Sequence, residues 1–123
     1  MSYEFKNPPG VDKQGYLMIQ DSKKRDKWND RFIQIKGPNF IIYKKDDCKK
    51  KVKDIRLVNA QIKPQPLYPK AIQIIPVVGK PVTFKTGTDK QVEEWFIALQ
   101  ASRGDTPEDY TVALGNIRGK DVD

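Results

Sequence analysis

The sequence contains no histidine and only one cysteine, Cys48, among its 123 residues. Without histidine the chain lacks the usual general base of enzymes and the commonest metal ligand in proteins. One cysteine cannot build a zinc site or an internal disulfide, and a reducing compartment is the simplest interpretation. No glycine-rich phosphate loop is present either. We therefore expect no metal and no cofactor, and an enzyme is the last of the function classes considered.

Long apolar runs are also missing. No stretch of 18 apolar residues could span a bilayer, and residues 1–9 match neither a secretory signal nor a myristoylation site. The composition is 37% hydrophobic and 32% charged, which is typical of a folded globular chain. We expect one domain with one core, cytoplasmic and monomeric.

Short segments of alternating polarity, separated by turn signals about every ten residues, dominate residues 13–86. Gly37-Pro38-Asn39 is a turn between two such segments, so residues 28–43 are predicted to be a hairpin. One further predicted strand begins with residues 15–19, and four others occupy 52–57, 59–63, 70–76 and 80–86. Pro64, Pro66 and Pro69 lie in the gap between the strands at 59–63 and 70–76. The pattern indicates an all-β sandwich or barrel.

The period changes to that of a helix at Thr88. Thr88 and Gln91 match a capping box, and Gly104 supplies the left-handed residue that ends a helix. The apolar face of this helix consists of Val92, Trp95, Phe96 and Leu99. Such a helix cannot bury that face alone, so it should close an open end of the sandwich. We also expect the aromatic residues Tyr16, Phe32, Phe40, Phe84, Trp95 and Phe96 to lie in the core.

The tail, residues 104–123, leaves two alternatives open. Thr106-Pro107-Glu108-Asp109 has the chemistry of a helix start, and Gly115 that of a stop. The tail is either a short docked helix or a flexible linker.

Taken in order, these segments resemble the pleckstrin homology (PH) family. The residues that carry the resemblance are Lys13-Gln14-Gly15-Tyr16-Leu17, Trp28-Asn29-Asp30-Arg31-Phe32, Phe40-Ile41-Ile42-Tyr43 and Glu94-Trp95 with Leu99. The resemblance implies a seven-stranded antiparallel β-sandwich or barrel capped by one C-terminal helix. It divides the chain into an N-terminal extension (1–11), the PH-like domain (12–103) and the tail (104–123). The Glu93-Glu94-Trp95 segment and the prolines at 64–69 are loosely similar to the PH domains that precede lipid-regulated (protein kinase B-like) kinases, so a kinase domain could follow Asp123.

Positive charge is concentrated in the first half of the chain. The net charge is +7, yet residues 13–56 hold 14 Lys and Arg against 6 Asp. In the predicted sandwich, the loops at 21–27 and 44–51 lie at the same end of the hairpin sheet, and the turn at 37–39 lies at the other. One end should therefore be strongly positive and attract phosphate-bearing surfaces, unless these lysines serve only solubility.

The family resemblance also implies which residues contact phosphates. Lipid-binding PH domains pair a lysine late in the first strand with a Lys/Arg-x-Arg motif at the start of the second. Here Arg31 matches the final arginine of that motif, and Lys44 matches a basic residue of the third strand. Asn29 stands where the motif has its first Lys or Arg, and Ile19 or Gln20 stands where the first-strand lysine is expected. Substitutes could come from the loop: Lys23, Lys24, Arg25 and Lys27. Arg31 could instead be a partly buried ion-pair partner of Asp30 or of a neighbouring residue.

These observations favour weak or promiscuous binding of phosphoinositides at the inner face of membranes. The alternative is a protein–protein interaction module with little lipid binding, using a sheet edge or the helix face. Nucleic-acid binding ranks lower, because no aromatic residues are interleaved with the lysines of residues 44–53.

Overall fold

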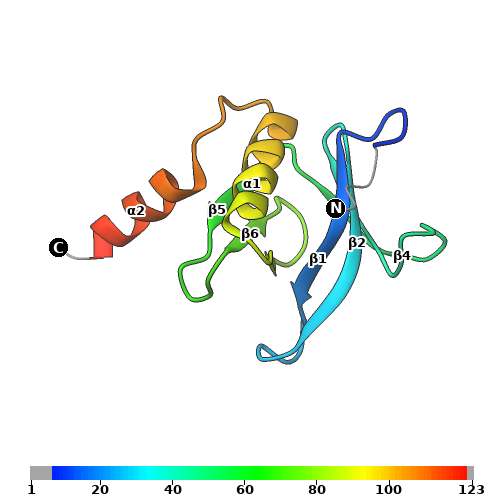
Figure 1. Cartoon of the computed structure of the whole chain (residues 1–123), viewed down its shortest axis with the longest axis horizontal. Coiled ribbons are helices and arrows are strands. Elements are labelled where there is room, and N and C mark those ends of the chain that lie inside the picture. Colours follow the sequence, from blue (N-terminus) through cyan, green and yellow to red (C-terminus); the bar gives the residue numbers. More distant parts are fainter. Residues whose placement is uncertain (1–6, 122–123) are drawn as a thin grey trace.

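The computed structural model describes residues 7–121, and the side chains of residues 7–117. Within that range it contains seven strands followed by two helices (Figure 1). The elements are β1 (Lys13–Gln20), β2 (Trp28–Lys36), β3 (Asn39–Tyr43), β4 (Lys51–Arg56), β5 (Gln61–Pro64), β6 (Ala71–Ile75), β7 (Val82–Lys85), α1 (Asp89–Arg103) and α2 (Tyr110–Asp121). The predicted fold class, seven antiparallel strands closed by a C-terminal helix, is confirmed.

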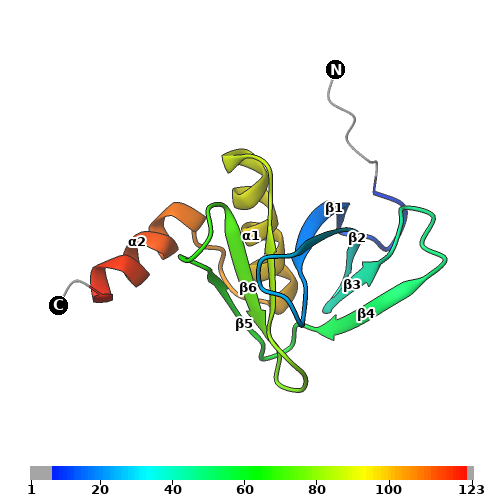
Figure 2. The same cartoon turned by 90° about the horizontal axis from the view of Figure 1, so that it is seen from below.

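The strands form one antiparallel sheet in the order β4-β3-β2-β1-β7-β6-β5. This sheet folds over on itself, so that β1–β4 form one layer and β5–β7 the other, with α1 beside both (Figures 1 and 2). The β2–β3 turn contains Gly37 at φ +54°, a left-handed conformation that glycine adopts at little cost. Since β2 pairs with both β1 and β3, the 21–27 and 44–50 loops lie at the end of the sheet opposite this turn.

The core lies between the two layers and under α1. Every second residue of each strand points inward, so Leu17, Ile33 and Phe40 join one buried cluster. Trp95 is only 4% exposed; its ring centroid lies 6.5 Å from that of Phe84, and the Lys13 ammonium lies 5.0 Å from the ring centroid. The predicted role of α1 is confirmed: its apolar face closes one end of the sandwich.

Local hydrogen bonds set the limits of α1. The Thr88 hydroxyl accepts a hydrogen bond from the Gln91 amide at 3.1 Å, and the Gln91 side chain accepts one from the Gly87 amide at 3.1 Å. At the other end Gly104 has φ +94°, and its amide donates to the carbonyl of Ala101 at 3.0 Å. The predicted start and stop of this helix are therefore confirmed.

Three predictions about local structure are wrong. Tyr16 is 45% exposed, because it alternates with Leu17 and so lies on the outer face, where its ring packs edge-on against Phe32. Pro64 is the last residue of β5 rather than part of the turn. Gly115 lies inside α2 and does not end it.

Within the tail, residues Tyr110–Asp121 form the helix α2, which packs against the domain. α2 begins at Tyr110, whose hydroxyl donates to the carbonyl of Ala71 at 2.8 Å. The Gln100 side chain donates to the Glu108 carbonyl at 2.9 Å and accepts from the Glu108 amide at 3.1 Å, which holds the connecting segment against α1. The predicted N-terminal extension lies partly outside the described residues; Val11, at its end, is buried.

Between residues 7 and 121, no helix is long and apolar enough to cross a membrane. No group of three or more His, Cys, Asp or Glu that could hold a metal ion occurs among the described side chains.

Replacing Trp95 tests the closing role of α1. Trp95→Ala should destabilise the domain by about 3–5 kcal/mol, as for other large buried aromatic residues. The control is Ile97→Ala in the same helix, since Ile97 is 38% exposed and should cost far less. Thermal or denaturant unfolding of both variants checks this, and similar stability losses would contradict the packing described.

Candidate functional site

A cavity of about 410 Å³ lies at the open end of the sandwich, away from α1. Its walls come from the end of β1, the β1–β2 loop, the first half of β2, β3, β4 and the turn before β7. The lining residues are Ile19, Gln20, Asp21, Ser22, Arg25, Asn29, Arg31, Ile42, Val52, Lys53, Lys80, Pro81, Val82 and Thr83. Four of them are cationic and one is a carboxylate, so the cavity has the charge to hold an anion.

The cations of this cavity come from separate parts of the sequence. Arg25 and Arg31 were predicted as phosphate contacts, and the structure brings them together here. Lys53 of β4 and Lys80 of the β6–β7 turn also line the cavity, and sequence reasoning missed both. Lys53 pairs with Ile42, whose side chain is in the core cluster, so alternation against β3 could have indicated its inward direction.

Arg31 reaches the cavity because of strand alternation. It shares the inner face of β2 with Ile33 and Ile35, and it pairs with the buried Leu17 of β1. At this end of the sheet the apolar core stops, so the guanidinium extends into the cavity instead of being buried. Its Nη1 donates to the main-chain carbonyl of Asp30 at 2.9 Å, which is not the ion pair considered from the sequence.

Asn29 and Asp21 both line the cavity and contact each other. The Asn29 amide donates to Oδ1 of Asp21 at 3.2 Å, and the other carboxylate oxygen accepts from the amides of Lys23 and Lys24, each at 3.0 Å. The hydrogen bonds from the Lys23 amide, the Lys24 amide and Asn29 hold the pKa of Asp21 below its ordinary value. The Asp21 carboxylate is therefore negatively charged at neutral pH and lowers the net positive charge of the cavity lining.

The β1–β2 loop is attached to the rest of the domain at its base. Gln20 donates from its side-chain amide to the Arg25 carbonyl and to the Tyr68 hydroxyl, both at 2.9 Å. The Trp28 ring meets Tyr68 edge-on, with centroids 5.1 Å apart, and the Lys85 ammonium lies 4.3 Å from the Trp28 ring centroid. These contacts join β2, the β5–β6 turn and β7 beside the cavity.

The remaining predicted contacts lie outside the cavity lining. The amide of Lys27 donates to the Lys24 carbonyl at 3.1 Å within the loop, while the side chains of Lys23, Lys24 and Lys27 are exposed. The Lys44 amide donates to the Lys50 carbonyl at 2.9 Å, so Lys44 begins the β3–β4 loop, next to an irregularity in the β3–β4 pairing. Their contact with phosphate stays a prediction.

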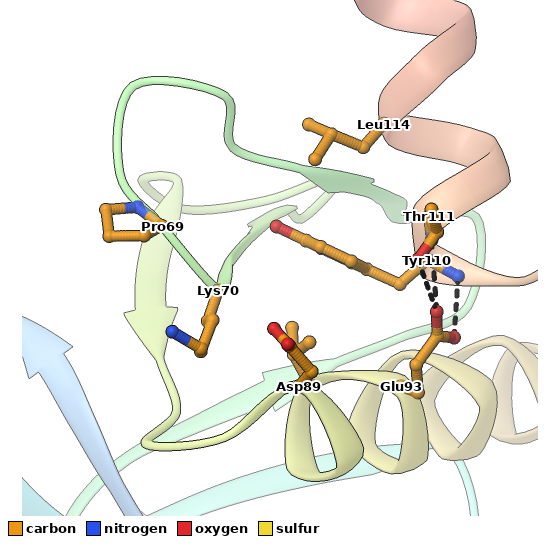
Figure 3. A pocket seen from close by; sticks show the side chains of 8 residues that line it. Pro69, Lys70, Asp89, Glu93, Tyr110, Thr111 and Leu114 are labelled. Atoms are coloured by element: carbon orange, nitrogen blue, oxygen red, sulfur yellow. Dashed lines mark hydrogen bonds between the residues drawn. The ribbon is translucent and has the colours of Figure 1, made fainter.

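A second cavity, of about 380 Å³, lies between α1, α2 and the β5–β6 turn (Figure 3). The Glu93 carboxylate accepts three hydrogen bonds at this cavity. Two come from the main-chain amides of Tyr110 and Thr111, at 2.8 and 3.1 Å, and one comes from the Thr111 hydroxyl at 3.0 Å. With Asp89 alongside and Lys70 as the one cation in the lining, this cavity does not suit a phosphate. Glu93 instead caps the first turn of α2.

The comparisons with known proteins agree with the observed fold. A family model described as PH domain matches residues 11–103. No curated protein matches the chain.

Among solved structures, the C-terminal PH domain of pleckstrin in complex with D-myo-Ins(1,2,3,4,5)P5 is similar, with a TM-score of 0.66 and 20% identity, covering 75% of this chain and 97% of that one. The PH domain of human KIAA0053 protein has a TM-score of 0.69 and 22% identity, covering 85% and 98%. The PH domain of human pleckstrin homology domain-containing protein family A member 5 has a TM-score of 0.66 and 20% identity, covering 87% and 89%. At these identities the likeness concerns the fold. The narrower likeness to kinase-leading domains stays a prediction.

Docking of α2 should depend on pH through Glu93. Burial raises the pKa of Glu93, but the hydrogen bonds from Tyr110 and Thr111 outweigh it, so the pKa lies below the ordinary 4.5. A lowered pKa means that the ionised carboxylate stabilises the docked state above pH 4.5, and that this contribution disappears as the pH falls through the lowered value. In NMR titrations the amide resonances of Tyr110 and Thr111 should therefore move in acid.

Two variants provide the controls for this titration. Glu93→Gln should remove the acid transition of these two amides, whereas Glu94→Gln should keep it, because Glu94 contacts Lys13 and Lys90 instead. An unchanged transition in Glu93→Gln would show that another group titrates.

Proposed function

The chain belongs to the PH domain family, and from that membership we propose that it is a non-catalytic module that binds phosphoinositide head groups at anionic membrane surfaces. One observation carries the proposal: Arg25, Arg31, Lys53 and Lys80 converge on a single open cavity that contains one carboxylate. Phosphate groups suit such a site, because charge-assisted hydrogen bonds from Arg and Lys are stronger than neutral ones. We place the module in the cytoplasm, peripheral at the inner face of membranes.

A pleckstrin PH domain that shares this fold was solved with an inositol pentakisphosphate. The present cavity differs from an optimal phosphate site at Asn29, whose side-chain amide donates a hydrogen bond to the Asp21 carboxylate. A phosphate near this position meets an amide and a negative charge instead of a second guanidinium or ammonium. We therefore propose weak or promiscuous head-group selection, with affinity supplied mostly by the summed positive charge.

The alternative is a protein-binding module that pairs its sheet edge with a partner strand. β4 ends the sheet order, so it offers a free edge to such a strand. However, β4 carries Lys51 and Lys53, and lysines on edge strands are a common device against pairing with other chains. The cavity therefore supports lipid binding better than the edge supports protein binding.

Single-charge variants separate a formed site from diffuse attraction. Arg31→Ala and Lys53→Ala should each weaken phosphoinositide binding by about 1–3 kcal/mol, the cost of losing a charge-assisted contact. Lys49→Ala removes the same charge from the exposed β3–β4 loop, outside the cavity lining, and should have a smaller effect. Vesicle co-sedimentation measures all three.

Equal losses in these variants would indicate diffuse attraction without a site. If none of the folded variants loses affinity, the phosphoinositide proposal is wrong, and the β4 edge becomes the surface to test.

Salt should weaken vesicle binding strongly. The screening length falls from about 10 Å at 0.1 M to about 3 Å at 1 M salt, so charges of the protein and the bilayer attract each other far less. Co-sedimentation with vesicles containing one phosphoinositide, at both salt concentrations, checks this. Binding of unchanged strength at high salt would show a site with specific short-range contacts, and weak selection would be the wrong description.

A further inference from the structure

The β6–β7 turn exposes two aliphatic side chains beside the cavity. Val77 is 69% exposed and Val78 is 87% exposed, the latter being the most exposed of the large hydrophobic residues that the structure describes. Figure 2 shows this turn projecting at the bottom of the view, beyond the ends of β6 and β7. The two neighbouring valines form a small exposed apolar patch at the tip of this turn, and apolar patches are a feature of surfaces that contact membranes or proteins.

The sequence of this turn gives it a defined shape. Pro76 is buried at its start and Pro81 lies at its end, and each proline restricts the backbone. Gly79 has φ +109°, a conformation that side-chain-bearing residues rarely adopt, so the chain reverses there. The two valines therefore lie on a short turn whose backbone is already restricted. Burying their side chains requires the loss of little further backbone entropy.

The turn is also part of the cavity wall. Lys80 and Pro81, which are separated from the valines by Gly79 alone, both line the cavity. Val52, which is 54% exposed, lines it from β4. Exposed aliphatic side chains therefore lie next to the cations of this cavity. A soluble inositol phosphate or a purely polar partner surface would have no apolar group for these side chains to contact.

The loop across the cavity has the opposite chemistry. Residues 21–27 read Asp-Ser-Lys-Lys-Arg-Asp-Lys and include no apolar residue. The two sides of the open end therefore differ: the β1–β2 loop is polar and mostly cationic, and the β6–β7 turn exposes aliphatic side chains. Interfacial protein segments combine these two chemistries, cations at head-group level and aliphatic side chains slightly deeper.

We propose that Val77 and Val78 enter the interfacial region of an anionic bilayer while the adjacent cavity binds a lipid phosphate. The inference rests on the proposed lipid-binding function and adds a second, apolar contact to it. The partner is the lipid bilayer itself, since a free inositol phosphate offers nothing for the valines to contact. The β6–β7 turn is the anchor, and the β1–β2 loop remains at the surface.

The test compares vesicles with a soluble head group. The vesicles contain phosphatidylcholine, phosphatidylserine and phosphatidylinositol bisphosphate, and the soluble ligand is inositol hexakisphosphate. The double variant Val77→Ser with Val78→Ser should bind these vesicles at least about tenfold more weakly, because the aliphatic area buried in the interface is lost. Its affinity for the soluble ligand, measured by calorimetry, should match that of the parent.

Val112→Ser is the matched control. Val112 is 51% exposed and lies in α2, which contributes no residue to the lining of this cavity. This variant should bind vesicles like the parent. If the valine variant also binds like the parent, or if both variants lose affinity equally, the inference is overturned.

A labelled variant reports insertion directly. Val78→Cys in a Cys48→Ser background leaves one thiol for an environment-sensitive dye, because the chain has a single cysteine. The dye emission should shift to the blue with vesicles and stay unchanged with inositol hexakisphosphate; no shift with bound vesicles would overturn the inference.

The two proposals fail in different ways. If the valine variant loses vesicle binding but Arg31→Ala and Lys53→Ala do not, the turn contacts the bilayer and the phosphate cavity is wrong. If only the cavity variants lose binding, the proposed function holds and the apolar anchor is wrong.

Discussion

Burial of the apolar face of α1 against one end of the sandwich is the contact on which the rest of the structure depends. Val92, Trp95, Phe96 and Leu99 come from one helix and reach residues of both layers. Because a single helix can cover only one end, the opposite end of the sandwich remains open. The loops at the open end do not have to contribute to the core, so their sequences can carry charge.

The cavity at the open end is a consequence of the same inward alternation that builds the core. On β2 the residues at positions 33 and 35 are buried isoleucines, and position 31 on the same face is an arginine at the edge of the apolar region. On β4, Lys53 likewise lies two residues from the buried Ile55, and it pairs with the core residue Ile42 of β3. Cations thus replace aliphatic residues at the point where inward-facing positions meet water.

Features determined by local pattern were predictable from the sequence, and those determined by long-range pairing were not. The 3.6-residue period and its caps predicted α1, and the family motif identified Arg31. Lys80 could not be assigned to the cavity, since its position depends on β7 pairing with β1, far away in the sequence. Lys44 was predicted as a phosphate contact; it directly follows β3, next to the irregularity in the β3–β4 pairing between Ile42 and Tyr43, and this contact stays a prediction. Tyr16 was assigned to the core because aromatic residues are usually buried, whereas its parity with Leu17 places it outside.

The contacts of Trp28 with Tyr68 and Lys85 join the two layers beside the cavity. Together with the hydrogen bonds of Gln20, they hold the base of the β1–β2 loop in place before any ligand arrives. The conformational entropy of these side chains is therefore lost during folding rather than during association. Under the proposed function, a cavity with few ideal phosphate contacts would gain most from this order of events, because more of the interaction energy would remain available as affinity.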